Sequence, residues 1–409
     1  MNRKVPAALI CIILGSGDFV HASPGARRVQ RPKPAAKPQK YSPEANQHVI
    51  DAQTAERRGD WQAAAASYLK ALKLAPSWAE VLVNLGAVYN HEGKSTEAIA
   101  AFTHAARIKP RLFAAHLNLG VTYFKTAQYT QAPQPLRRAI ALEPNNKQAR
   151  QLLALSLIAL EKFAEAVDQL KMLRQGPEVD PPILQALGQS YLRLRRYPEA
   201  VEVLEDLVRR SPDSAQAHLL LGEALDSDSQ SERAIPEFRR AIEIDPKLPE
   251  AHYAAAVALL RRGDTEEAAR LLEQELELNP AMTLALFHLG RINLSRGQID
   301  EATALLSRVT ETAPDFRPGF ESLGQALLRK GDGPKAVTVL EHAVSLDPSW
   351  PNGHALLGRA YMATGQREQA KKSFATSQRL AAEERQRLEG AVRSSHPQRR
   401  RPKRGRPTN

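Results

Sequence analysis

The sequence predicts an all-α protein built as a solenoid of stacked helical pairs, and three regularities of spacing support this fold class. Prolines, small residues and alanines each recur at steps of 34 residues, apart from one proline step of 68. Ten repeats therefore align between about residues 45 and 382 without insertion or deletion. A fixed period of this size indicates repeats that stack on their neighbours. The prolines are Pro76, Pro110, Pro144, Pro212, Pro246, Pro280, Pro314 and Pro348.

Each repeat is expected to form two helices, which are easiest to follow when Ala79 is numbered position 1. Positions 4, 7, 8 and 11 share one face of a first helix, and the small residue at position 8 lets a neighbouring helix approach. Glycine is common at position 15, where it can end this helix through positive φ. The alanine at position 20 and apolar residues at positions 24 and 27 form the packing stripe of a second helix. The proline at position 32 ends that helix.

This pattern resembles the tetratricopeptide repeat, a helix-turn-helix unit of 34 residues. The resemblance covers about four-fifths of the chain and implies a right-handed α-solenoid with a concave, partner-binding side. The tryptophan that the family prefers at position 4 is replaced, most often by histidine or leucine, and Arg150 makes the fourth repeat the least faithful.

Charge and cysteine content restrict the other possibilities. The formal net charge is +12, but residues 23–42 carry six basic residues and no acid, and residues 393–409 carry seven and no acid. The repeats themselves are therefore nearly neutral. The chain has one cysteine, Cys11. Without it, no disulfide, cysteine metal site or thiol nucleophile can form.

The N-terminus reads as an export signal. Two basic residues precede the apolar run from Val5 to Leu14, and Val20-His21-Ala22 offers a cleavage site. The run is too short to span a bilayer, so no transmembrane span is expected. We therefore predict an exported protein, periplasmic or secreted, of the bacterial cell envelope.

These features divide the chain into six segments. A signal peptide (1–22) and a basic Pro/Ala-rich linker (23–44) precede repeats one to four (45–178). Repeats five to ten (181–382), a C-terminal capping helix (383–392) and a disordered basic tail (393–409) follow. Residues 174–182 are rich in proline and are expected to form a junction, either a hinge or a stiff corner.

The sequence shows no pattern typical of a metal, cofactor or catalytic site. Histidines recur at position 4, but neighbouring repeats stand roughly 10 Å apart, whereas zinc ligands lie about 2 Å from one metal. These histidines are therefore expected to pack, with no metal and no cofactor. The sequence contains no nucleophile elbow, P-loop, dinucleotide fingerprint or HExxH motif. We accordingly expect no enzyme.

The resemblance implies that positions 2, 5, 9 and 12 line the concave groove. Apolar residues gather there in two places and are typical of a binding surface. The alternative is that neighbouring repeats cover some of them as ordinary core, above all at position 12. The candidates are Leu117, Val121, Phe124, Leu155 and Ile158, and then Tyr253, Val257, Leu260, Leu284, Phe287 and Leu294.

The predicted function is a non-catalytic scaffold that binds peptide segments or partner helices of other proteins along this groove. The alternative is a nucleic-acid-associated protein. Arg404, Gly405 and Arg406 resemble the core of an AT-hook, in which an extended Arg-Gly-Arg enters the minor groove of DNA. Adhesion of the basic tails to an anionic envelope polymer, or a role in solubility alone, is favoured over DNA binding.

Overall fold

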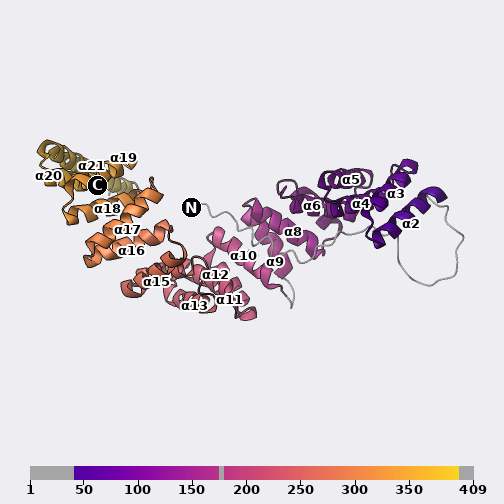
Figure 1. Ribbon diagram of the computed structural model, residues 1–409, viewed down its shortest axis with the longest axis horizontal. Helices are drawn as coiled ribbons and strands as arrows, with labels where there is room; N and C mark the ends of the chain where they lie inside the picture. The colour runs from indigo at the N-terminus through magenta and orange to yellow at the C-terminus, as the bar shows by residue number, and fades with distance from the viewer. Residues whose placement is uncertain (1–40, 175–178, 396–409) are drawn as a thin grey trace, which may run out of the picture. The chain divides into compact units, whose positions relative to one another are not determined.

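The structure, a computed structural model, describes residues 41–174 and 179–395. Within these residues it holds twenty α-helices, paired in ten repeats, and no strand (Figure 1). The first helices of the repeats, the A helices, are α2 (Pro43–Arg57), α4 (Ala79–His91), α6 (Phe113–Lys125), α8 (Lys147–Ala159), α10 (Pro181–Arg193), α12 (Ala215–Ser227), α14 (Ala251–Arg262), α16 (Thr283–Arg296), α18 (Arg317–Lys330) and α20 (Pro351–Ala363). The second helices, the B helices, are α3 (Trp61–Leu74), α5 (Ser95–Ile108), α7 (Pro133–Leu142), α9 (Phe163–Arg174), α11 (Tyr197–Arg210), α13 (Ser231–Ile244), α15 (Thr265–Leu278), α17 (Ile299–Thr312), α19 (Gly333–Leu346) and α21 (Arg367–Ser395).

The small residue at position 8 sets how closely the two helices of a repeat approach. A Cβ built on Gly86 would lie 2.6 Å from the Phe102 ring, and one on Gly324 would lie 2.4 Å from Leu340 Cδ2. Both partners occupy position 24. Because a side-chain carbon cannot stand that close, a Cβ at either glycine would force the position-24 side chain to shift. Repeats one, four and seven instead pack an alanine at position 8 against Tyr68, Leu170 and Leu272.

Position 15 has positive φ in all ten repeats, whichever residue occupies it. Glycine is present in six of them, for example Gly93 at +74° and Gly263 at +95°. The other four repeats force ordinary residues into the same conformation. These are Ala127 (+56°), Glu161 (+57°), Arg195 (+57°) and Ser229 (+63°). The turn therefore follows from the repeat geometry, and glycine only makes it easier.

The chain divides into two compact units between Gln230 and Ser231. Compact unit 1 contains α2 to α12 and compact unit 2 contains α13 to α21 (Figure 1). Within each unit, the A and B helices that follow one another along the chain pack against each other. The predicted signal peptide and most of the basic linker lie outside the described residues, as do residues 396–409 of the tail.

The A helices also touch one another directly, for instance α4 with α6 in compact unit 1 and α18 with α20 in compact unit 2. Successive B helices make few or no such contacts among the described residues. The layer with the shorter helix-to-helix step must lie on the inside of a curved stack. Within each compact unit, the A helices therefore form the concave layer.

The predicted junction at 174–182 falls inside compact unit 1. Residues 175–178 lie outside the described residues, but α9 and α10 on either side pack against each other, and Val179 is buried. Whether this segment bends remains a prediction.

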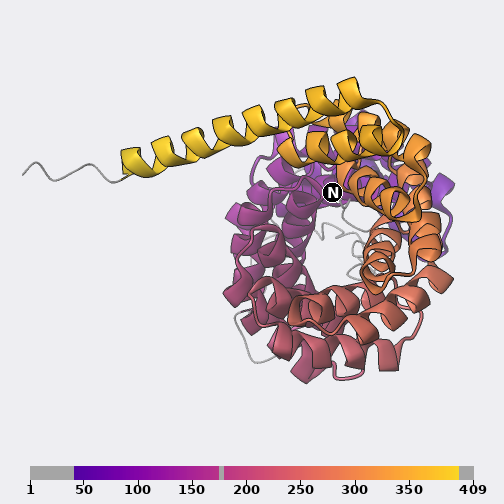
Figure 2. The same ribbon diagram turned by 90° about the vertical axis from the view of Figure 1, so that its left-hand side faces the viewer.

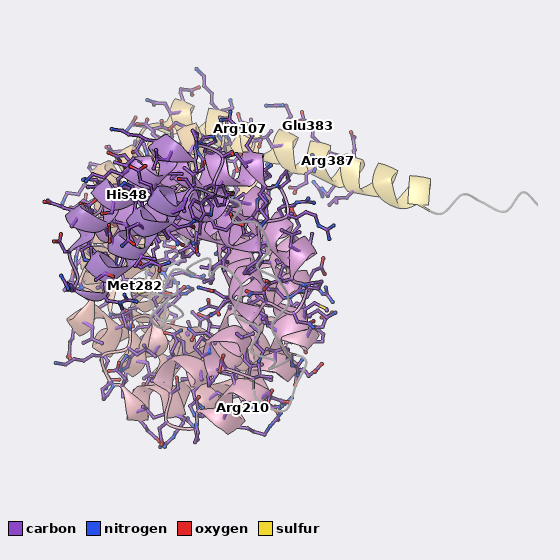
Figure 3. The ribbon with its side chains drawn as sticks, turned by 90° about the vertical axis from the view of Figure 1, so that its right-hand side faces the viewer. His48, Arg107, Arg210, Met282, Glu383 and Arg387 are labelled. Carbon is purple, nitrogen blue, oxygen red and sulfur yellow. The ribbon has the colours of Figure 1, made fainter. Side chains whose placement is uncertain are left out.

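Two helices differ from the expected pattern. In a second helix that began at the usual register, Pro135 would remove a hydrogen bond and bend the helix. Instead α7 begins one turn late at Pro133, so both prolines fall in its first turn, where a missing N–H removes no intrahelical hydrogen bond. The expected separate cap at 383–392 is the continuation of α21, a single helix of 29 residues. Residues 383–389 are all exposed, and α21 extends past α20 there (Figure 2). Figure 3 shows Glu383 and Arg387 on this part.

Candidate protein-binding surface

The A helices of compact unit 2 carry a row of accessible side chains on their concave side. On α14, Tyr253, Val257 and Leu260 are half-buried, while His252, Ala256 and Leu259 are buried. Spacings of four and three residues place the accessible three on one face. This face is the predicted groove face, and it stays open to solvent in α14.

The same face continues across the following helices. The Tyr253 ring centroid lies 6.0 Å from that of His288, which joins α14 to α16. Leu284 is half-buried and Arg291 exposed on α16, and Leu328 is half-buried on α18. At the end of the row, 52% of Met362 on α20 is exposed. We call this surface of α14, α16, α18 and α20 the A-layer face.

The predicted apolar groove divides into two parts in the structure. The five candidates from repeats three and four are at most 3% exposed, so their side chains pack as core in this conformation. Leu117, Val121 and Phe124 belong to α6, and Leu155 and Ile158 to α8. For these five residues, neighbouring helices cover the side chains as they would cover ordinary core.

The six candidates from repeats seven and eight are more accessible. Tyr253, Val257, Leu260 and Leu284 are half-buried. Phe287 and Leu294 are largely covered. Phe287 packs edge-on against Phe316, with ring centroids 5.1 Å apart. A groove lined by apolar residues therefore stays a proposal that rests on the first four.

Polar residues that the apolar pattern missed also lie on the A-layer face. Position 9 reads Arg291, Gln325 and Arg359 in repeats eight to ten, and both arginines are exposed. The signal was present in the sequence, since three successive repeats place a hydrogen-bond donor at one register position. Reading only the apolar residues overlooked it.

Two other arginines near this face are occupied by internal contacts. Arg317 lies 3.5 Å from a Glu321 carboxylate oxygen and 3.7 Å from one of Asp347, and its guanidinium stands 4.4 Å from the centre of the Trp350 ring. Arg329 donates to the Leu294 carbonyl at 2.7 Å. Burial raises the pKa of Glu321, an effect that Arg317 and then Arg291 oppose. This carboxylate is thus partly neutralised from within the protein.

Three of the five histidines at position 4 contact the loops between repeats. The Nε2 atoms of His116, His218 and His354 each lie 3.0 Å from the carbonyl oxygen of the proline six residues earlier. Arg150 donates to the Pro144 carbonyl at 2.7 Å in the same way. A side chain with a donor of suitable reach makes this contact in four repeats, whereas repeats two, five, eight and nine have Leu82, Leu184, Leu286 and Phe320 at position 4 and no donor there. No group of three metal-binding side chains gathers anywhere in the described residues.

Repeat seven departs from this arrangement at the start of α14. Glu250 has a φ of +67°, and α14 begins only at Ala251. The buried carboxylate of Glu275, on α15, accepts from the backbone N–H groups of Glu250 and Tyr253. It occupies position 27, where five other repeats have alanine. His252 is buried, its Nδ1 has no hydrogen-bond partner, and burial lowers its pKa.

The pKa of Glu275 is raised, chiefly by burial, and the two backbone N–H groups oppose the shift. The carboxylate thus replaces a small packing residue in order to cap a helix that starts late. A sequence pattern could indicate the exception, because glutamate at position 27 is incompatible with an ordinary apolar stripe.

Comparison with known protein families explains the repeat. A model of the C-terminal domain of cilia and flagella-associated protein 70 matches residues 22–258. Two models of the tetratricopeptide repeat match residues 259–323 and 352–384. The chain belongs to the family of the cilia and flagella-associated protein 70 C-terminal domain. It is a tetratricopeptide-repeat protein, as the spacing predicted. A search of curated proteins gave no significant match.

Solved structures share the helical fold. A structure of MamA is 20% identical and covers 41% of this chain and 97% of its own, with a TM-score of 0.39. Human IFIT1, as a dimer with m7Gppp-AAAA, is 18% identical over 84% of this chain and 91% of its own, with a TM-score of 0.39. The Naa15/Naa10 complex bound to HypK-THB is 15% identical over 82% of this chain and 63% of its own, with a TM-score of 0.46. At these values the likeness extends to the fold alone.

The family match overturns the predicted localisation. The C-terminal domain of a cilia and flagella-associated protein points to a eukaryotic ciliary or flagellar protein, so the prediction of an exported protein of the bacterial cell envelope was wrong. The expectation rested on a ten-residue apolar run after two basic residues, which is a short and unspecific pattern. A signal peptide and a periplasmic or secreted location have no support from the comparisons. Among the described residues, none of the helices could cross a membrane.

Proposed function

We propose that this chain is a protein-interaction scaffold that binds segments of partner proteins on the A-layer face of compact unit 2. Tetratricopeptide-repeat scaffold families are typically non-catalytic, and we propose that this chain likewise carries out no chemistry of its own. Its role is then to hold partner proteins together. The AT-hook-like residues Arg404, Gly405 and Arg406 lie outside the described residues, and no observation favours the nucleic-acid alternative.

The observation that carries this proposal is the contrast between the two sides of the A helices. Their core sides are buried in every repeat, while in compact unit 2 their concave sides leave Tyr253, Val257, Leu260 and Leu284 accessible. Apolar side chains that stay open to solvent on a concave layer favour the docking of an extended segment or an amphipathic helix. The A-layer face extends across four repeats, from α14 to α20.

The test uses the full chain immobilised as bait in an extract of its own cells. Leu260→Ser and Leu284→Ser should each reduce recovery of a specific set of partners, because each change removes apolar contact from the A-layer face. The matched control is Leu278→Ser, since Leu278 is also an accessible leucine but lies on α15 in the other layer. Circular dichroism checks that all three variants keep their helical content. Partners recovered equally by every variant would contradict the proposed surface.

The family name also leads to a cellular proposal. We propose that the chain works in ciliary or flagellar assemblies, as the name of the family indicates for its members. A fluorescent fusion of the full chain at either end should then concentrate along cilia or flagella. Diffuse fluorescence or exclusion from these organelles would remove this part of the proposal without affecting the binding surface.

A further inference from the structure

The position-9 row on the A-layer face has the chemistry of a carboxylate-binding surface. Arg291 and Arg359 are exposed, and within the described part of the chain neither has a carboxylate within ion-pair distance. Arg291 lies over the ring of Phe287, 5.6 Å from its centroid, which orients the guanidinium. Arg317 and Arg329, by contrast, are already paired internally. These two positive charges thus have no ion-pair partner among the described residues, although Arg291 also acts on Glu321 from further away.

An apolar row runs beside these arginines. Leu328 and Met362 occupy position 12, three residues after Gln325 and Arg359, and residues three apart lie on the same face of a helix. On α20, the last A helix of the described residues, 52% of Met362 is exposed. Methionine adapts its shape to different apolar partners. An incoming segment would therefore meet charge and apolar surface together.

The spacing sets the length of that segment. Adjacent A helices stand about 8–10 Å apart, so two repeats separate Arg291 from Arg359 by roughly 16–20 Å. An extended chain advances about 3.3 Å per residue, so five or six residues (~18 Å) span this distance. The Gln325 amide lies between the two arginines and can donate to or accept from a peptide backbone.

We propose that the A-layer face from α16 to α20 binds an acidic segment of a partner protein. Two carboxylates about six residues apart pair with Arg291 and Arg359, and an apolar side chain between them rests on Leu328 and Met362. This inference deepens the proposed function and rests on it. The two basic segments of the chain, residues 23–42 and 393–409, contain no acid and would be repelled by the two arginines, so they do not fit this site. The bases of a single-stranded nucleic acid stack best on aromatic side chains, whereas this row offers Leu328 and Met362.

Fluorescence anisotropy with the full chain tests the proposal. The probes are labelled peptides about 12 residues long, each with two glutamates separated by three to eight residues and a leucine between them. Matched peptides with glutamine in place of glutamate, and a single-stranded oligonucleotide, complete the set. The best acidic peptide should bind, with the optimum near a separation of six residues, and added salt should weaken it. The glutamine peptides should bind at least about tenfold more weakly.

Arg291→Gln and Arg359→Gln should each weaken binding of the acidic peptide about tenfold, and the double variant about a hundredfold. Met362→Ser should weaken binding of the acidic peptide a few-fold, because it removes one apolar contact. Arg270→Gln is the matched control, because Arg270 is an exposed arginine on α15 in the other layer. It should leave binding unchanged.

Four results would overturn the proposal. The first two are equal binding of the acidic and glutamine peptides, and no binding of any acidic peptide. The others are an equal loss of binding in Arg270→Gln, and tighter arginine-dependent binding of the oligonucleotide. Recovery of partners from cell extracts distinguishes the acidic-segment proposal from the proposed scaffold function. If Leu260→Ser and Leu284→Ser lose partners while the arginine variants keep them, the acidic segment is wrong and the scaffold surface stands. If none of these variants loses partners, both proposals fail.

Discussion

Single residues show how far the repeat geometry overrides local preference. Position 15 has positive φ in all ten repeats, and in four of them a residue other than glycine adopts it. A left-handed conformation costs such a residue about 1–2 kcal/mol. Glycine avoids this strain, but it loses more conformational entropy on folding, which offsets part of the difference. These four positions are therefore local weak points that the stack tolerates.

Replacing Glu161 with glycine should stabilise the protein by about 0.5–1 kcal/mol, because it relieves the backbone at a φ of +57°. The measurement is the thermal or urea unfolding midpoint of the full chain. Lys171→Gly is the control, since Lys171 is exposed in the last turn of α9, where its φ is helical and glycine should cost up to about 1 kcal/mol. A loss of stability in Glu161→Gly would contradict the account of the turn.

Position 8 gives the opposite kind of prediction. Gly324→Ala should destabilise the protein by about 1–3 kcal/mol, because the added Cβ would stand 2.4 Å from Leu340 Cδ2. Unfolding midpoints measure the effect. The same change in a Leu340→Ala background should cost clearly less, since the opposing side chain is gone. Equal costs in the two backgrounds would show that the clash does not set the helix spacing.

At the scale of elements, α14 depends on a cap from a neighbouring helix. Glu250 adopts positive φ, and the helix begins at Ala251, two residues later than its register predicts. Glu275 of α15 then accepts from the N–H groups of Glu250 and Tyr253. Glu275→Ala should destabilise this helix end by about 1 kcal/mol. Hydrogen exchange of the first turn of α14 should accelerate, while exchange in α18 stays unchanged.

The pH dependence of Glu275 has a definite sign. Burial raises its pKa in the folded protein above the value in the unfolded chain, so the folded state holds the proton more tightly. Its contribution to stability is fully present below the unfolded pKa and is lost as pH rises through the folded pKa. Glu275→Gln cannot ionise, so its unfolding midpoint relative to the natural chain should improve between pH 4 and pH 7. An unchanged difference over this range would contradict the raised pKa.

At the scale of the whole molecule, the repeat was predictable and the accessible surface only partly so. Helix pairing depends on positions such as those of Gly324 and Leu340, which recur at the same spacing within each repeat and can therefore be identified from the sequence. The exposure of a concave residue depends instead on what packs beside it in three dimensions. Phe124 is covered whereas Leu260 at the same register position is half-buried, and period and composition do not distinguish these two cases. The arginines at position 9 were visible in the sequence but lay outside a search for apolar residues.

The central claim is that partner proteins contact the A helices of compact unit 2. Its most direct test places a photo-crosslinking amino acid in the full chain inside its own cells, at Val257 or Met362 on the A-layer face and at Leu278 on α15. The account predicts crosslinked partner proteins from Val257 and Met362, competed by an excess of unmodified chain, and none of these partners from Leu278. The same partners crosslinked from Leu278, or no adduct from either A-layer position, would contradict it.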